Sequence, residues 1–73
     1  MPVIWPNPAS DYLIVGKTER NTNYIIKNSI GKTVMEGKLE NSSIIRVDRL
    51  NSGIYFISLE GSKKRTVNTF VKE

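Results

Sequence analysis

The sequence contains no cysteine and no histidine among its 73 residues. Without cysteine the chain can form no disulfide and carries no thiolate nucleophile, and without either residue type it lacks the usual ligands of zinc. Histidine is also the usual general base near neutral pH, so the serines, Ser10 and Ser52 among them, have no partner for triad chemistry. No glycine-rich phosphate-binding loop is present. The composition therefore predicts a domain that is not an enzyme and that binds neither a metal nor a cofactor.

Long apolar runs are also missing. No stretch is apolar for long enough to cross a bilayer as a helix. The first residues do not show a basic segment followed by an apolar run, as a secretory signal would. Hydrophobic residues make up 38% of the chain and charged residues 25%, a balance typical of a globular domain. We therefore predict one small folded domain over residues 1–73, with no transmembrane segment.

The net charge of +4 raises the question of a nucleic-acid partner. The basic residues gather at one place only, Lys63-Lys64-Arg65, and the others are scattered among acidic residues. Proteins that bind single strands usually combine a basic groove with aromatic stacking platforms, whereas the aromatic residues here fall inside apolar strand patterns. The charge pattern predicts a solvated hairpin tip and no nucleic-acid binding.

Short β-rich stretches are separated by glycine, proline and asparagine about every eight to twelve residues, which is the spacing of a sandwich or barrel. No helical periodicity is sustained over a full window. We predict an all-β, immunoglobulin-like antiparallel β-sandwich of about seven short strands, at residues 3–5, 12–15, 23–28, 33–39, 44–47, 54–59 and 65–72. Alternation assigns the following side chains to the core: Leu13, Val15, Tyr24, Ile26, Val34, Ile45, Val47, Tyr55, Ile57 and Leu59.

The stretch Leu50-x-x-Gly53-x-Tyr55 has the spacing of a tyrosine corner. In immunoglobulin-like sandwiches, a tyrosine near the start of a late strand donates its hydroxyl to a backbone group upstream. We expect Leu50 to fill the core beneath the loop and Gly53 to permit the turn into the strand. The three residues are therefore predicted to form a structural corner.

The stretch Trp5-Pro6-Asn7-Pro8 is predicted to be stiff and extended, because a residue that precedes proline is restricted to extended geometry. Two interpretations remain open. The segment is either a rigid lead-in to the domain, or a recognition surface that binds with little loss of conformational entropy.

The last strand ends in Phe70-Val71-Lys72-Glu73. By itself this is an apolar strand with charge at its edge, which is a common protection against edge-to-edge pairing. We expect the Lys72 side chain to be exposed, because lysine is rarely buried.

In this order, the three stretches resemble the type A C-terminal sorting domain of Bacteroidota, which ends cargo proteins of the type IX (Por) secretion system. The resemblance covers nearly the whole chain and implies a tail cut from a larger secreted cargo protein to which it is covalently fused. It implies recognition by the outer-membrane translocon, with Pro6, Asn7, Pro8, Gly53, Tyr55 and Lys72 as candidate recognition residues. It also implies cleavage before Trp5 by a sortase-like cysteine protease. The cargo would reach the cell surface or the medium through the periplasm and the outer membrane of a Gram-negative bacterium.

Two other functions remain open. One is a small binding or adhesion module for carbohydrate or protein, appended to a secreted enzyme. The other is a purely structural spacer. The position of the segment in its full gene discriminates among them, because a sorting domain must be terminal whereas a spacer or a binding module need not be.

Overall fold

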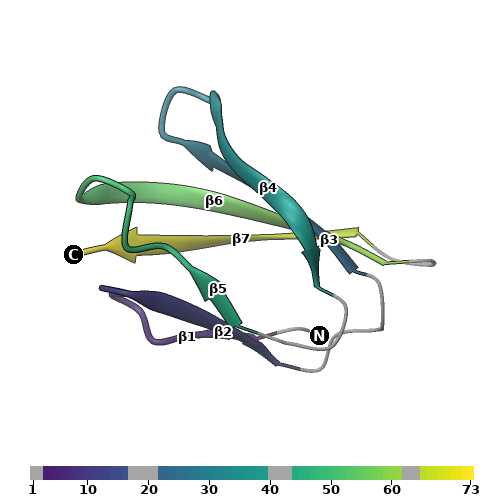
Figure 1. The fold of residues 1–73 in the computed structure, drawn as a ribbon. Helices are drawn as coiled ribbons and strands as arrows, with labels where there is room; N and C mark the ends of the chain where they lie inside the picture. Colours follow the sequence, from purple (N-terminus) through teal and green to yellow (C-terminus); the bar gives the residue numbers. More distant parts are fainter. Residues whose placement is uncertain (1–2, 17–21, 40–43, 62–64) are drawn as a thin grey trace.

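The computed structural model describes residues 3–16, 22–39, 44–61 and 65–73, and over these residues the chain forms strands and turns without a helix (Figure 1). The strands are β1 (Val3–Trp5), β2 (Tyr12–Gly16), β3 (Thr22–Asn28), β4 (Thr33–Leu39), β5 (Ile44–Arg46), β6 (Gly53–Glu60) and β7 (Arg65–Lys72). The predicted all-β class is confirmed, and each described strand lies within a residue or so of its predicted range. Lys63 and Lys64 of the predicted hairpin tip lie outside the described residues.

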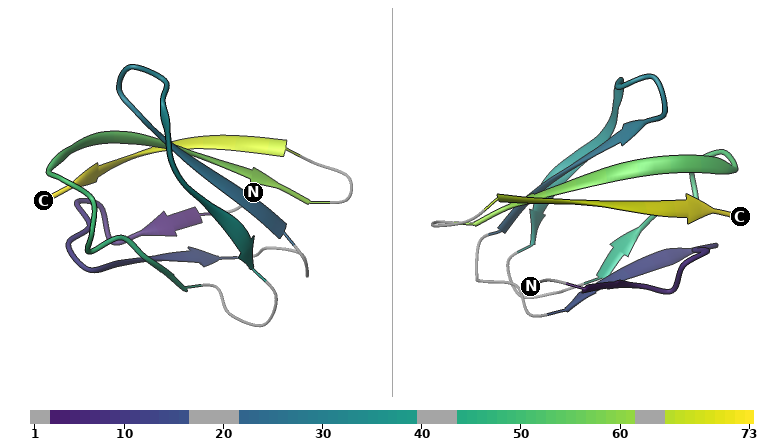
Figure 2. Two further views of the ribbon diagram at one scale, coloured as in Figure 1. Left: turned by 45° about the horizontal axis from the view of Figure 1, so that its top comes forward. Right: turned by 180° about the vertical axis from the view of Figure 1, so that it is seen from behind.

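Two antiparallel sheets face each other as the layers of a sandwich (Figure 2). The smaller sheet has the order β1-β2-β5 and the larger sheet has the order β4-β3-β6-β7. In constant-type immunoglobulin domains the fourth strand lies beside the fifth, but here β4 pairs with β3. The larger sheet therefore ends in β4 on one side and in β7 on the other.

The core lies between the two sheets, where alternate residues of each strand point inward. Nine of the ten side chains assigned to the core contact it, with Tyr24 half-buried at its margin. The structure adds further buried residues that alternation did not assign: Ala9, Leu39 and Phe70. Ala9 belongs to no strand, and its burial is explained by the edge contact described below.

Val34 is the exception among the predicted core residues, because its side chain is 37% exposed. Pairing along β3 and β4 passes from Ile26 opposite Met35 to Lys27 opposite Thr33, so Val34 has no opposite residue. An extra residue of this kind is a β-bulge, and it reverses the alternation beyond it. Met35 packs against the core in place of Val34. The assignment of Val34 was therefore wrong by one residue.

Tyr24 and Gly37 form a close cross-strand pair on β3 and β4. A Cβ atom built on Gly37 would lie 2.8 Å from the Tyr24 hydroxyl oxygen and 3.0 Å from two ring carbons. The glycine thus leaves room for the tyrosine ring to lie across the strand, and the ring covers backbone that would otherwise be bare.

The described residues include no helix that is long and apolar enough to cross a membrane.

Candidate functional site

The segment that contains Asn7 and Ala9 lies along the outer edge of β7. Ala9 forms an isolated parallel bridge with Lys72. Its N–H donates to the Val71 carbonyl at 2.7 Å, and its carbonyl accepts from the Glu73 N–H at 2.8 Å. The side-chain oxygen of Asn7 accepts from the Val71 N–H at 2.9 Å, across 64 residues of sequence. The first and last candidate motifs are therefore joined by three hydrogen bonds.

The path of this segment corrects the prediction that Trp5 to Pro8 is extended. β1 ends at Trp5, the chain bends at Asn7 and Pro8, and both X-Pro peptide bonds, Trp5-Pro6 and Asn7-Pro8, are cis. The chain bends here for two reasons that concern the hydrogen bonds of the sheets. Proline has no N–H with which to continue the β1 ladder. The chain must also leave the smaller sheet to reach the edge of the larger one, and it does so beside the C-terminus (Figure 1).

The stretch from Leu50 to Tyr55 forms a corner at the start of β6. The Tyr55 hydroxyl donates to the Asn51 carbonyl at 2.7 Å, which is the backward hydrogen bond of a tyrosine corner. Leu50 is half-buried against the core, and its N–H donates to the Val47 carbonyl at 3.0 Å. Gly53 has a φ of +152°, a conformation that residues with a side chain rarely adopt.

This corner lies against the end of β7, so the candidate residues converge. Gly53 is opposite Lys72, and Tyr55 is opposite Phe70. The rings of Tyr55 and Phe70 stack, with centroids 5.6 Å apart and an interplanar angle of 21°. We call the region formed by residues 6–9, 53–55 and 70–73 the terminal surface. It contains all six candidate recognition residues.

Lys72 departs from its predicted exposure, because only 8% of the residue is accessible to solvent. Its Nζ donates to the Glu73 carbonyl at 3.0 Å. Lys72 follows Phe70 on the inward face of β7, and the Ala9 segment covers the strand edge beside it. The long aliphatic stem can be buried while the ammonium group bonds near the chain end. The expectation that Lys72 is a surface residue was wrong.

Replacing Tyr55 with phenylalanine is expected to lower the free energy of unfolding by about 1 kcal/mol. The Asn51 carbonyl then loses its only described partner, and it can recover part of the lost bond from water because Asn51 is exposed. Thermal unfolding followed by circular dichroism measures the change. Tyr12→Phe is the matched control, because the Tyr12 side chain is on an exposed position. Equal melting temperatures for the two variants would contradict a stabilising role for the corner bond.

Sequence reasoning missed the hydrogen bonds that join the two ends of the chain. Ala9 contributes only backbone groups, which have no signature in residue type. Asn7 offered a weak signal of a distant hydrogen bond. Its two proline neighbours have no N–H, so the Asn7 side-chain oxygen has few local donors.

One exposed ion pair, Arg46 with Asp48 at 3.5 Å, lies at the end of β5. The side-chain hydrogen bond from Arg46 holds the pKa of the Asp48 carboxyl below its usual value. Within the described ranges, no three histidine, cysteine, aspartate or glutamate side chains gather as metal ligands would. The hydrogen bonds of the terminal surface involve the side chains of Asn7, Tyr55 and Lys72 and the backbone of Ala9, Val71 and Glu73.

The fold and this surface define a class: small immunoglobulin-like domains whose N-terminal segment closes the edge of their C-terminal strand. The family model of the secretion system C-terminal sorting domain matches residues 3–73. The chain belongs to this family, the sorting domains of type IX secretion. Membership implies a cargo fused to the domain and export to the cell surface or the medium in Bacteroidota.

A solved structure has a similar fold, with a TM-score of 0.77. It is that of PorZ, described as an essential bacterial surface component of the type-IX secretion system of Porphyromonas gingivalis. The two share 16% sequence identity over 99% of this chain and 11% of the PorZ chain, so the likeness concerns the fold alone. The search of curated proteins gave no match.

Proposed function

We propose that the translocon of the type IX system recognises the terminal surface of this domain and so selects the fused cargo for export. The observation that supports this most directly is the set of hydrogen bonds joining Asn7 and Ala9 to Val71 and Glu73. The first and last motifs of the family thereby become one surface, which a single partner can contact at once. The bound partner would find this surface already ordered, which limits the entropy lost on binding.

The domain itself contributes no catalysis in this proposal. A sortase-like cysteine protease of the secretion system supplies the chemistry and cuts the chain before Trp5. The cargo crosses the periplasm and the outer membrane, and it is then attached to lipopolysaccharide or released. The absence of cysteine and histidine from the whole sequence supports the assignment of the cleavage to another protein.

Fusing residues 1–73 to the C-terminus of a periplasmic reporter is expected to deliver the reporter to the cell surface in a strain that has the translocon.

Asn7→Ala in this fusion should reduce delivery, because it removes the acceptor of the Val71 N–H and loosens the terminal surface. Its effect on the free energy of unfolding should be only about 0.5–1 kcal/mol, since the bond is exposed. Surface labelling of the reporter and the melting temperature are measured on the same variants. Ser10→Ala, on an exposed neighbouring residue, is the matched control.

Lys72 is tested in the same assay with Lys72→Met and Lys72→Arg. Methionine keeps most of the buried aliphatic stem and removes the charge, whereas alanine would also remove buried packing. If the translocon reads the ammonium group, delivery should fall in Lys72→Met and persist in Lys72→Arg at similar melting temperatures. Normal delivery of both folded variants would exclude Lys72 as a recognition residue. A folded wild-type fusion that stays in the periplasm would contradict the whole proposal.

A second candidate function, carbohydrate binding, is favoured by one observation. Trp5 and Tyr12 are 44% and 45% exposed on the outer face of the smaller sheet. Trp5 on β1 is opposite Ile14 on β2. Tyr12 is two residues from Ile14 along β2, so Trp5 and Tyr12 are diagonal neighbours on the same face of the sheet. Aromatic rings present flat apolar faces with which the C–H faces of sugars can stack. Because Trp5 is the only tryptophan, its fluorescence should shift on titration with an oligosaccharide if this function is correct. An unchanged spectrum across a panel of oligosaccharides would exclude it.

A further inference from the structure

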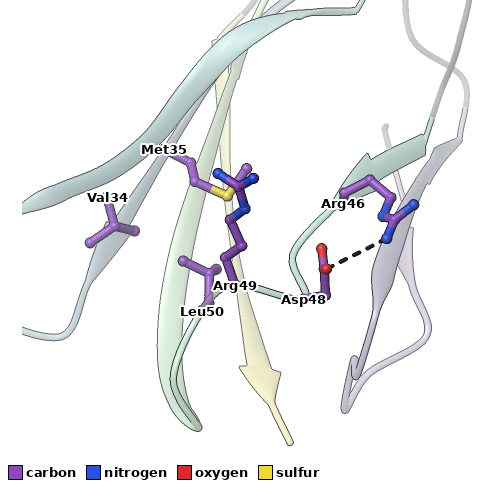
Figure 3. Close-up of a pocket in the computed structure, with 6 residues that line it drawn as sticks. All are labelled: Val34, Met35, Arg46, Asp48, Arg49 and Leu50. Atoms are coloured by element: carbon purple, nitrogen blue, oxygen red, sulfur yellow. Dashed lines mark hydrogen bonds and ion pairs between the residues drawn. The ribbon is translucent and has the colours of Figure 1, made fainter.

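A cleft of about 520 Å³ opens beside the connection between β5 and β6 (Figure 3). It lies between β4, the edge strand opposite β7 in the larger sheet, and the end of β5 with the connection that follows it. Its lining residues are Val34, Met35, Arg46, Asp48, Arg49 and Leu50. Leu50 also belongs to the corner, but none of the lining residues belongs to the terminal surface.

One wall of the cleft is apolar. Met35 and Leu50 are half-buried and pack against the core, so their outer surfaces are held in fixed positions. Val34 adds an exposed side chain to the same wall, because the β-bulge removes it from the core face of β4. An apolar group bound here would remove all three side chains from water.

The rim of the cleft carries an excess of positive charge. Arg46 is paired with Asp48, so their charges compensate. Arg49 forms no ion pair with any carboxylate in the described part of the chain. Figure 3 shows its side chain extending from the β5–β6 connection toward Met35, across the apolar wall. A ligand with a carboxylate next to an apolar group would match this arrangement of charge and apolar surface.

The position of the cleft favours a peptide over a small anion. β4 pairs only with β3, so alternate backbone N–H and C=O groups of β4 face away from the sheet. An extended peptide beside β4 could bond to these groups and place alternate side chains in the cleft. A small anion could engage Arg49 but would leave the strand edge and the apolar wall uncovered.

We propose that this cleft binds an extended acidic and apolar peptide segment of a partner protein. An apolar side chain of the segment lies on Val34, Met35 and Leu50, and a neighbouring carboxylate pairs with Arg49. The interaction uses no residue of the terminal surface.

The test uses the 73-residue chain labelled with ¹⁵N and the capped hexapeptide Glu-Leu-Glu-Val-Glu-Leu as the probe. Titration followed by NMR should shift amide signals of β4 and residues 46–50, and leave those of residues 70–73 unchanged. Arg49→Gln should weaken binding by about fivefold, since an exposed charge pair contributes modestly. Arg65→Gln is the matched control, because Arg65 is an exposed cation on β7, at the other edge of the sheet. Its affinity for the peptide should equal that of the wild type.

Three outcomes would overturn the proposal. The first is that the peptide shifts signals elsewhere on the domain and not at the cleft. The second is that a peptide with glutamine in place of glutamate binds equally well, which would remove the role of charge. The third is that vesicles containing an anionic phospholipid shift the cleft signals when the peptide does not, which would assign the site to a membrane surface. Salt dependence adds a second readout, because binding through Arg49 should weaken as ionic strength rises.

Discussion

Replacing Phe70 with alanine is expected to abolish the cooperative thermal unfolding of the domain. Phe70 is fully buried and stacks on Tyr55, so the change leaves a cavity beneath the corner. Loss of a buried phenylalanine side chain lowers the free energy of unfolding by about 3–5 kcal/mol. A domain of this size is stabilised by only a few kcal/mol, so the variant should be largely unfolded at room temperature. Near-ultraviolet circular dichroism and a thermal scan measure the loss.

Val67→Ala is the matched control for Phe70→Ala. Val67 lies on the same strand with its side chain 58% exposed, so its truncation should change stability by less than about 0.5 kcal/mol. A cooperative transition of normal midpoint in the Phe70 variant would show that the contact between β7 and the corner does not hold the fold together.

Replacing Gly53 with alanine should lower the free energy of unfolding by about 1–3 kcal/mol through backbone strain alone. Nothing lies within 4 Å of a Cβ atom built at this position, so no steric contact opposes the substitution. The φ of +152° is the sole obstacle, because a side chain disfavours it. Chemical denaturation gives the change in the midpoint at constant slope.

Ser52→Ala provides the comparison, because Ser52 is the exposed residue next to Gly53. Its midpoint should stay close to that of the wild type. If the midpoint of Gly53→Ala equalled that of Ser52→Ala, the corner would tolerate a different backbone conformation at residue 53. The proposed structural role of Gly53 would then be wrong.

The β6 strand illustrates what the sequence can predict. Tyr55, Ile57 and Leu59 alternate without interruption, and the two neighbouring strands pair with β6 in continuous register. The alternation of residue types along β6 matches its buried face, so it was sufficient to predict which side chains enter the core. In β4 the same method failed at Val34, because a bulge depends on how two strands pair and not on the residue types of one strand.

The terminal surface could be predicted only in part. The motifs around Asn7 and Tyr55 were identified as separate candidates from turn chemistry and spacing. Their convergence was not, because it depends on which strand lies at the edge of the larger sheet. The burial of Lys72 has the same origin: lysine usually indicates exposure, and only the covering Ala9 segment reverses that expectation.

The hydrogen bond between Asn7 and Val71 also has a kinetic consequence. Contacts between residues 64 apart form late, because the chain must first lose the entropy of closing so long a loop. The two sheets between these residues bring the ends together, so the bond can persist only once both have assembled. An unfolded or half-folded tail would therefore display its motifs separately and lack the joined surface. A partner that requires the joined surface would select chains that have completed folding.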